Sequence, residues 1–437
     1  MRALLVGGGG REHAIGLSIL KGGHELTVIS PNRNPGLASI AKKIVVGNEN
    51  DKQFVLKEAL KLKPDYVFIG PESPLENGVS DILLENGFKV FAPSSVAAKL
   101  ETSKAYCRRF MFENRIKGNV RSEEFTKSEE VSSFIRSIDY EFVVKPDGLT
   151  GGKGVVVQGV HFKTKEEGIK IARDYLKSGM GKLLVEEKMV GEEFSLQAFV
   201  KGKEIYFLPA VQDYKRAFEG DIGPNTGGMG SVCFSEKGLP FIPSKTLEGA
   251  KGIMRELVEK FSRRVTDYVG PIYGGFIATR EGPKLLEINA RLGDPEAINV
   301  LSLMEDSIVE VAISLLHGLD PHLEFRDRIN VLRYLVPKGY GSKPTPSKME
   351  IDVEGILLRG LRIYYASVNK RGKYLMQTTS RSVGLLSEGR DLTSITKRFE
   401  GISSLVKGDY SLRNDIGTKG MIEGKVKTMS EMMKGAA

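Results

Sequence analysis

The sequence predicts a multidomain protein with a parallel α/β unit at its N-terminus, an α+β region in its middle and a small mixed β unit at its C-terminus. Its 437 residues exceed what one small hydrophobic core needs. Strand and helix patterns alternate over the first hundred residues, which is typical of a parallel α/β unit. After Thr102 the pattern changes to paired strands joined by tight turns, which indicates an antiparallel α+β region.

The N-terminal unit is predicted from buried apolar runs that alternate with amphipathic segments. We expect strands at 3–6, 26–29 and 66–69, and helices at 11–21 and 51–62. The turn VGGGGREHAIG opens the first helix, where backbone N–H groups and the helix dipole suit a phosphate. A GxGxxG motif cannot be placed on it, so a dinucleotide is not expected. Phosphate binding and a purely structural glycine turn are equal alternatives.

The middle region is predicted to contain three strand pairs. They are FVVK with GVVVQGV, SLQAFV with EIYFLPAV, and FIAT with KLLEIN. Long helices are expected at 246–268 and at 295–317, the second with Asp294 as its N-cap. Further on we expect strands near 351–358, a helix near 392–399 and a weakly ordered final dozen residues.

Charge and cysteine content limit the classes of partner. The net charge is +9, but Lys and Arg are mixed with Asp and Glu along the chain. This favours small phosphorylated ligands over nucleic acid, with an unspecific solubilising surface as an equal alternative. Cys107 and Cys233 are far apart, which supports neither a disulfide nor a zinc site and fits a reducing cytoplasm. No secretion signal or membrane span is visible, so no membrane partner is expected.

The stretch KPDGLTGGKGVVV, residues 145–157, places two lysines around a glycine-rich turn. It is not a Walker A loop, because Lys153 is followed by Gly154 rather than Ser or Thr. Since it joins two apolar strands, we predict a hairpin tip that can fold over phosphates with its N–H groups. Lys145 and Lys153 would then meet the phosphate chain from opposite ends. The alternative is a solvent-exposed turn without a ligand.

Three further stretches suggest a site. Glu287 and Asn289 lie two apart on a predicted strand, hence on one face, where two oxygen ligands suit Mg²⁺ on a polyphosphate. An ordinary surface pair is the alternative. The stretch GPESPLENG follows the third strand at the sheet edge where ligands bind in α/β proteins. The charged, glycine-rich stretch 211–231 is predicted to be a functional loop, with disorder as the alternative.

Taken in order, these motifs resemble the phosphoribosylamine–glycine ligases, an ATP-grasp family of purine synthesis. The resemblance rests on GGGGREHAI, GPESPLENGVSD, KLETSKAYCRRFM, KPDGLTGGKGVVV, QDYKR, GPNTGGMGS and EINARLGDPE, and weakens after residue 318, where SLRNDIG resembles the final motif. It implies an N-terminal pre-ATP-grasp domain at 1–101, an ATP-grasp domain of two α+β lobes at 102–325 with its small flap lobe at about 122–191, and a C-terminal domain at 326–427 before a tail at 428–437. It also implies a cytoplasmic monomer or weak homo-oligomer that joins glycine to 5-phosphoribosylamine with ATP and Mg²⁺, or alternatively Mn²⁺.

The resemblance assigns residues to four groups. ATP would be held by Lys104, Lys145, Gly148, Gly151, Gly152, Lys153, Gly154, Glu186, Glu187, Met189 and Glu193. The metal would be held by Glu287 and Asn289. Glycine and its acyl phosphate would be surrounded by Asp213, Lys215, Arg216, Asn225, Thr226, Gly227, Gly228, Met229, Arg291, Gly293 and Asp294, with Arg291, Asp213 and Lys153 acting in catalysis. Phosphoribosylamine would be held by Gly9, Gly10, Asn34, Gly36 and Glu72.

The sequence departs from the family's pattern at 379–381, where Thr379 and Ser380 precede Arg381 in place of a glycine pair. No site residue is therefore assigned beyond Asp294. Two alternative functions are another ATP-grasp carboxylate–amine ligase, which would lack the continuity from QDYKR to NTGGMG, and a non-catalytic nucleotide or nucleic-acid binder, which would bind RNA with a steep salt dependence.

Overall fold

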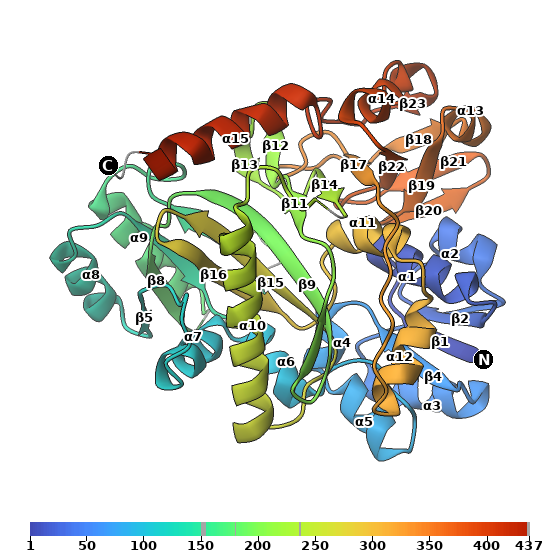
Figure 1. The fold of residues 1–437 in the computed structure, drawn as a ribbon, viewed down its shortest axis with the longest axis horizontal. Helices are drawn as coiled ribbons and strands as arrows, with labels where there is room; N and C mark the ends of the chain where they lie inside the picture. The colour runs from blue at the N-terminus through green and yellow to red at the C-terminus, as the bar shows by residue number, and fades with distance from the viewer. Residues whose placement is uncertain (150–153, 180, 236, 435–437) are drawn as a thin grey trace.

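A computed structural model describes residues 1–149, 154–179, 181–235 and 237–434. The elements form an N-terminal unit, a small lobe at the opposite end, and a large central sheet that continues into the C-terminal strands (Figure 1). No helix within the described ranges is long and apolar enough to cross a membrane.

The N-terminal unit is the parallel α/β unit that the alternating pattern predicted. Its strands lie in the order β3 (Lys43–Val46), β2 (Glu25–Ser30), β1 (Arg2–Val6), β4 (Tyr66–Ile69), all parallel. Its helices are α1 (Gly10–Lys21), α2 (Pro35–Ile40), α3 (Lys52–Leu62), α4 (Glu72–Glu76) and α5 (Val79–Glu85). Because the strands are parallel, the loops after β1 and β4 meet at one sheet edge, beside the central sheet (Figure 1).

The small lobe follows α6 (Ser95–Thr102) and α7 (Lys104–Glu113). It is an antiparallel sheet in the order β5 (Ser122–Phe125), β8 (Leu183–Glu187), β6 (Phe142–Pro146), β7 (Val156–Val157), with α8 (Ser128–Ser137) and α9 (Lys165–Lys177). A separate apolar core that includes Ile135, Phe142 and Ile169 holds the two helices against the sheet. The predicted hairpin is confirmed, since Val143 pairs with Val157.

The central sheet carries most of the remaining strands. Its order is β16 (Gly282–Asn289), β15 (Val269–Thr279), β9 (Glu192–Lys201), β11 (Val211–Asp213), β14 (Gly230–Phe234), β17 (Ile329–Leu335), β22 (Val383–Gly389), β19 (Leu361–Tyr365), and β10 (Glu204–Phe207) pairs with β9. The predicted pairing across Lys201 and across Gly282 is confirmed. Helix α10 (Ser244–Arg264) packs on this sheet; it begins two residues before and ends four residues before the range 246–268 predicted for a long helix.

The C-terminal part adds a second small sheet and several helices. The sheet order is β20 (Val368–Arg371), β21 (Tyr374–Gln377), β18 (Lys348–Ile351), β23 (Val406–Gly408). The helices are α13 (Val353–Leu358), α14 (Leu392–Lys397), the 3₁₀ turn η1 (Ile402–Ser404) and α15 (Lys419–Lys434). Helix α15, red in Figure 1, returns across the central sheet towards the small lobe.

Two sequence predictions were wrong because capping residues outweighed the apolar pattern. The helix expected at 295–317 is two helices, α11 (Glu296–Leu303) and α12 (Ile308–Leu316), since Ser307 and Glu310 form a capping box that starts a new helix. Asp294 does not cap α11, because its carboxylate is bound elsewhere. The strand expected over 351–358 ends at Ile351, after which Asp352 caps α13.

Two regions expected to lack regular structure contain it. Residues 211–231 form β11, the hairpin β12 (Arg216–Phe218) and β13 (Ile222–Asn225), and the start of β14. The final segment is helical to Lys434, with Ile422 and Met429 buried. In both cases long-range packing supplies stability that a local pattern does not reveal.

Candidate active site

The half-buried carboxylate of Glu287 on β16 lies within electrostatic reach of three lysines. Lys104 begins α7, Lys145 lies on β6 and Lys215 follows β11. Burial tends to raise the pKa of the Glu287 carboxyl, but the three lysine charges lower it below its ordinary value. Three separate segments therefore place positive charge around one carboxylate, an arrangement that suits a bound polyphosphate.

Lys145 is held in place by a buried ion cluster. Its Nζ lies 2.6 Å from Glu186 Oε2. Arg108 on α7 binds the same carboxylate through Nε at 2.7 Å and through Nη2 at 3.2 Å. Burial opposes ionisation of Glu186, yet the charges of Arg108 and Lys145 lower its pKa to about 2. Glu186, predicted to hold ATP, thus faces Lys145 and Arg108 and fixes the lysine between the small lobe and the central sheet.

The remaining predicted ATP residues surround the hairpin and the edge of β8. Lys104 Nζ donates to the Gly148 carbonyl at 2.7 Å, which joins α7 to the start of the hairpin turn. Glu187 ends β8, Met189 lies half-buried just beyond it, and Glu193 on β9 pairs with Lys215 at 3.0 Å. Gly154 lies at the far side of the turn. The predicted flap residues Gly151, Gly152 and Lys153 lie outside the described residues.

Glu287 and Asn289 share one face of β16, as their spacing predicted. Asn289 Nδ2 donates to Glu287 Oε1 at 3.5 Å, and Asn289 Oδ1 accepts from Arg291 Nη2 at 3.4 Å. An ionised carboxylate beside an amide oxygen fits Mg²⁺, which takes one or two protein oxygens and completes its shell with phosphate and water. The donor set therefore matches the metal that a polyphosphate carries.

The loop after β13 brings three segments together around Asp213. A Cβ added to Gly228 would lie 2.7 Å from Asp213 Oδ1, 2.8 Å from Pro295 and 3.3 Å from Arg381. Gly228 also has φ +107°, so only glycine fits this close approach. Met229 is buried behind it and donates its N–H to the Tyr214 carbonyl. The predicted residues of this loop are therefore brought together with a C-terminal arginine.

Asp213 is an unusual carboxylate. Its Oδ1 is buried and has no hydrogen-bond donor among the described residues. Burial and the neighbouring Glu296 raise its pKa well above the ordinary value, although Lys215 and Arg381 oppose the shift. A buried carboxylate oxygen without a donor, near a second acid, suits a small ammonium group.

The other residues of the β12–β13 region shape this loop. Arg216 pairs with Asn225 across the hairpin. Thr226 Oγ1 donates to the Lys215 carbonyl at 2.8 Å and accepts from Gly228 N at 3.0 Å. Gly227 donates its N–H to the hydroxyl of Tyr340 at 3.3 Å. Thr226 therefore positions the loop from within.

Asp294 is the meeting point of the central and C-terminal strands. Its Oδ1 accepts from the Tyr334 hydroxyl at 3.0 Å, and its Oδ2 lies 3.0 Å from Arg381 Nη2. Arg381 also donates to the Asp294 carbonyl at 2.7 Å and to the Gly227 carbonyl. Both carboxylate oxygens of Asp294 are thus occupied, which favours a positioning role. Gly293, its neighbour, donates its N–H to Gln197 at 2.8 Å.

Arg291 joins β16, the strand that carries Glu287 and Asn289, to the N-terminal unit. Its guanidinium lies 3.3 Å from Glu72 at the start of α4 and 3.0 Å from Glu101 on α6. Burial opposes ionisation of Glu72, but Arg291 and Arg11 lower its pKa to about 2. For Glu101, burial outweighs the pull of Arg291 and raises the pKa to about 7. A chain of charged groups therefore runs from the first sheet edge to Glu287.

The four residues predicted to hold phosphoribosylamine besides Glu72 line the edge of the first sheet. Gly9 donates its N–H to Glu12 at 2.6 Å, and a Cβ on Gly10 would lie 2.5 Å from the Tyr334 hydroxyl. Asn34 is fully buried; its Nδ2 donates to three carbonyls and its Oδ1 accepts from Gly36 and Leu37. Because the protein itself occupies the hydrogen-bonding atoms of the Asn34 side chain, this side chain positions the loop.

Sequence reasoning missed several residues that complete the site. They are Glu101, Arg108, Gln197, Glu296, Tyr334 and Arg381. Glu101 and Glu296 lie inside the motifs KLETSK and LGDPE, which could have drawn attention to them. Arg381 was noted only where the sequence departs from the family's pattern, and Tyr334 has no local signal, because the pairing of β17 and β22 with the central sheet is what brings both residues to the site.

A sheet-and-lobe architecture that directs lysines from both lobes at a carboxylate and an amide oxygen defines an ATP-grasp ligase. The family models for phosphoribosylglycinamide synthetase match the chain over residues 1–101 (N domain) and 102–297 (ATP-grasp domain). The chain belongs to the phosphoribosylglycinamide synthetase family.

Known phosphoribosylamine–glycine ligases match this chain over nearly its full length. A phosphoribosylamine–glycine ligase of Pyrococcus abyssi is 42% identical over 99% of this chain and 98% of its own length. The crystal structure of a phosphoribosylamine–glycine ligase from Thermotoga maritima is 29% identical, with a TM-score of 0.80 over 95% of this chain and 100% of that one. An N5-carboxyaminoimidazole synthetase of Staphylococcus aureus complexed with ADP shares the fold, with a TM-score of 0.63 at 16% identity over 92% of this chain and 96% of that one.

Proposed function

We propose that the protein is an ADP-forming ligase that joins glycine to 5-phosphoribosylamine and yields glycinamide ribonucleotide, ADP and phosphate. The observation that carries this proposal is that Lys104, Lys145 and Lys215, from three separate segments, lie within electrostatic reach of Glu287, and that the buried acids Asp213 and Glu296 lie near Lys215 and near each other. A polyphosphate and a small amino acid would thus meet at one place. Family membership over the whole chain supports the choice of substrates.

In the first step a carboxylate oxygen of glycine attacks the γ-phosphorus of ATP. The bond from that phosphorus to the β–γ bridging oxygen breaks, ADP leaves, and glycyl phosphate forms. Lys104 and Lys145 neutralise the phosphate oxygens, as Lys153 would from the flap, so catalysis rests on positioning and charge. Bound Mg²⁺, held by Glu287 and Asn289, would add charge neutralisation on the phosphates.

The acids at Asp213 and Glu296 would receive the ammonium group of glycine. The raised pKa of Asp213 falls when a cation arrives, so substrate binding relieves the cost of burying two acids together. Gly228 and Pro295 approach Asp213 so closely that they leave little room for a side chain on the substrate. This packing would favour glycine over larger amino acids.

In the second step the amine of phosphoribosylamine attacks the carbonyl carbon of glycyl phosphate. The carbon–oxygen bond to phosphate breaks, phosphate leaves, and the amine nitrogen gives up a proton, which the departing phosphate can take, as the amide forms. Phosphoribosylamine would lie between Glu72 and the glycine loop at Gly9 and Gly10. Arg291 links Glu72 to β16, so it would align the two reacting groups.

We also propose the division into units at 1–101, 102–325 and 326–427, a monomer or weak homo-oligomer, and a cytoplasmic location, where ATP and phosphoribosylamine are available. The family models change from one to the next at residue 101, in support of the first boundary. The central sheet crosses the second boundary through β17, so we expect the last two units to unfold together.

An assay of ADP release tests the proposal. Phosphoribosylamine is generated in the assay mixture, and each substrate is omitted in turn. We expect ADP release to require glycine and serine to substitute poorly. ADP release without glycine, or equal rates with serine, would overturn the assignment. ATP binding without turnover under any condition would favour a non-catalytic nucleotide binder.

A further inference from the structure

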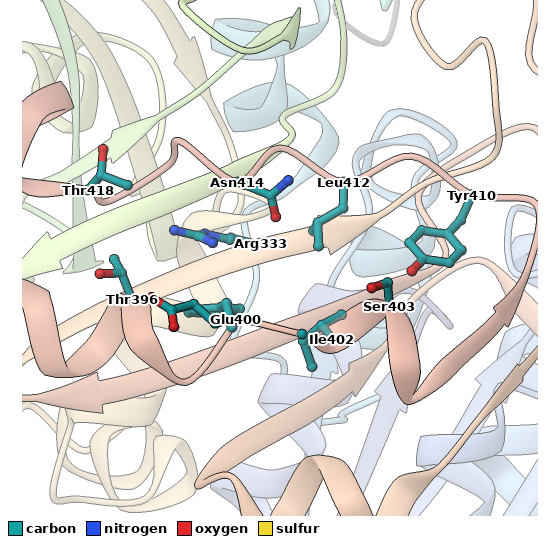
Figure 2. A pocket seen from close by; sticks show the side chains of 11 residues that line it. Arg333, Thr396, Glu400, Ile402, Ser403, Tyr410, Leu412, Asn414 and Thr418 are labelled. Atoms are coloured by element: carbon teal, nitrogen blue, oxygen red, sulfur yellow. The ribbon is translucent and has the colours of Figure 1, made fainter.

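A second hollow lies in the C-terminal part, on the other side of β17 from the site described above. It has a volume of about 570 Å³, within the size range of pockets that hold small molecules. Figure 2 shows Arg333 among its lining side chains, with Thr396, Asn414 and Thr418 around the guanidinium and Ile402, Ser403 and Tyr410 further along. None of these residues belongs to the ATP-grasp site.

Arg333 is the unusual member of this pocket. Its side chain is 3% exposed. Its Nε and Nη2 both donate to the Ile416 carbonyl, at 3.0 and 2.8 Å, and the guanidinium stacks on Phe399 at 4.4 Å from the ring centre. Within the described ranges, Arg333 forms no ion pair, whereas the nearby Arg413 is bound by both Asp221 and Asp415.

A buried arginine without an acidic partner is costly. Burial lowers the pKa of Arg333 to about 10, against the weaker opposing pull of Asp415 and Glu219. The side chain still carries its charge at neutral pH. An anion in the pocket would compensate that charge in a place where water screens it poorly.

The rest of the lining fits an organic anion. The hydroxyls of Ser403 and Tyr410 can donate to an anion along the pocket, whereas those of Thr396 and Thr418 already donate to the Leu392 and Asp415 carbonyls. Ile402 and Leu412 form an apolar wall for a carbon body. The acidic Glu400 at the pocket is exposed and can turn to solvent.

We propose that this pocket is a binding site for a small organic anion whose phosphate or carboxylate group pairs with Arg333. Its place in the fold connects it to the ligase site. Arg333 precedes Tyr334, which holds Asp294, and pairs across the sheet with Gly230, at the end of the loop that approaches Asp213. A ligand bound at Arg333 would therefore lie one residue along β17 from Tyr334, which binds Asp294 at the proposed glycine site.

Calorimetric titration of the full chain at low salt tests this proposal, with inorganic phosphate, ribose 5-phosphate and citrate as separate probes. Arg333→Met removes the charge, and Arg371→Met, at an exposed arginine outside the pocket, is the matched control. We expect at least one probe to bind Arg333→Met about tenfold or more weakly than Arg371→Met. A phosphate-only effect identifies a phosphorylated ligand, and a citrate-only effect identifies a carboxylate.

A second variant keeps the test decisive if Arg333→Met fails to fold. Ser403 is exposed at the pocket, so Ser403→Phe would fill the hollow and leave Arg333 intact, with Lys407→Phe as its control. Probe binding that is weakened by Ser403→Phe alone supports the site. Equal affinities in each variant and its control, or no binding by any probe, would overturn it.

Discussion

Arg381 and Asp294, 87 positions apart in the sequence, form a two-point contact in which Nη2 lies 3.0 Å from the carboxylate and Nη1 donates to the main-chain carbonyl at 2.7 Å. The same guanidinium donates to the Gly227 carbonyl. One side chain from the loop between β21 and β22 therefore holds both segments that surround Asp213.

Replacing Arg381 by lysine should separate binding of glycine from binding of nucleotide. Lysine keeps the charge but cannot serve Asp294 and Gly227 together, because it lacks the planar fork of donors. We expect kcat/KM for glycine to fall about 100-fold, since small misplacements of reacting groups cost that much, while ADP affinity stays unchanged. Steady-state kinetics and an ADP titration measure the two effects.

The exposed Lys370, on β20, provides a control, since Lys370→Ala should leave both quantities unchanged. An Arg381→Lys enzyme with normal glycine kinetics would mean that the C-terminal strands do not position the site.

Glu287→Gln should reduce turnover by at least about 100-fold, because even residues that only support a metal ligand cost 10- to 100-fold. The change removes the negative charge that lies near the three lysines and that would hold the metal. A higher Mg²⁺ requirement should accompany the loss. Glu281→Gln, at the exposed turn of the same hairpin, serves as the control. If turnover and Mg²⁺ dependence both stay normal, Glu287 is not a metal ligand.

Asp213→Asn should abolish a pH dependence of glycine binding. The carboxyl of Asp213 has a raised pKa, so its anionic form accumulates as the pH rises through that value. We therefore expect kcat/KM for glycine to rise with pH in the native enzyme. In Asp213→Asn the value should be roughly 100-fold lower and should lose this rise, with KM for ATP unchanged. A rising limb that survives the substitution would place the titrating group elsewhere.

The parts of the fold that could be predicted from the sequence are those set by residues close together in the chain. Hairpins such as the one across Lys201 and Gly202 are set by adjacent strands and a tight turn, so a local pattern suffices. The pairing of β14 with β17 has no such signal, because the two strands lie far apart in sequence and their register depends on the whole core. The capping box at Ser307 was a readable signal that a continuous apolar pattern obscured.

The same distinction applies to the site. Glu287 and Asn289 could be paired from their spacing on one strand, and their orientation is confirmed. The ion-pair partner of Lys145 could not be predicted from the sequence. Glu186 and Arg108 come close to Lys145 only after β6, β8 and α7 have packed together. Asn34 was predicted to hold phosphoribosylamine, and in the structure its buried amide hydrogen-bonds to the main chain. A motif thus identifies important residues more readily than it assigns their roles.

Glu101→Gln should change how stability depends on pH. Because burial raises the folded-state pKa of Glu101 from 4.5 to about 7, the folded state binds the extra proton between these values. Native stability from this group is therefore present at low pH and decreases as the pH rises through 4.5 to 7. Glutamine cannot ionise, so the variant should gain on the order of 3 kcal/mol relative to the native protein between pH 4.5 and 7.5.

Urea unfolding at the two pH values measures this difference. Glu113→Gln, at an exposed position on α7, should show no comparable change. A Glu101→Gln curve parallel to the native one would show that Glu101 is ionised throughout, in which case the pull of Arg291 outweighs burial.

The half-buried Lys425 ties helix α15 to the central sheet, and Lys425→Met should loosen this attachment. Lys425 Nζ lies 2.8 Å from Glu192 on β9 and 3.4 Å from Asp221 in the β12–β13 hairpin, with the lysine side chain 11% exposed. Methionine keeps the stem but leaves the Glu192 carboxylate without its cation, which should lower the free energy of unfolding by about 2–4 kcal/mol. Lys427, on the same helix, is 78% exposed, and Lys427→Met should change it by less than about 0.5 kcal/mol. Equal effects of the two substitutions in denaturant unfolding would mean that α15 packs through its apolar residues alone.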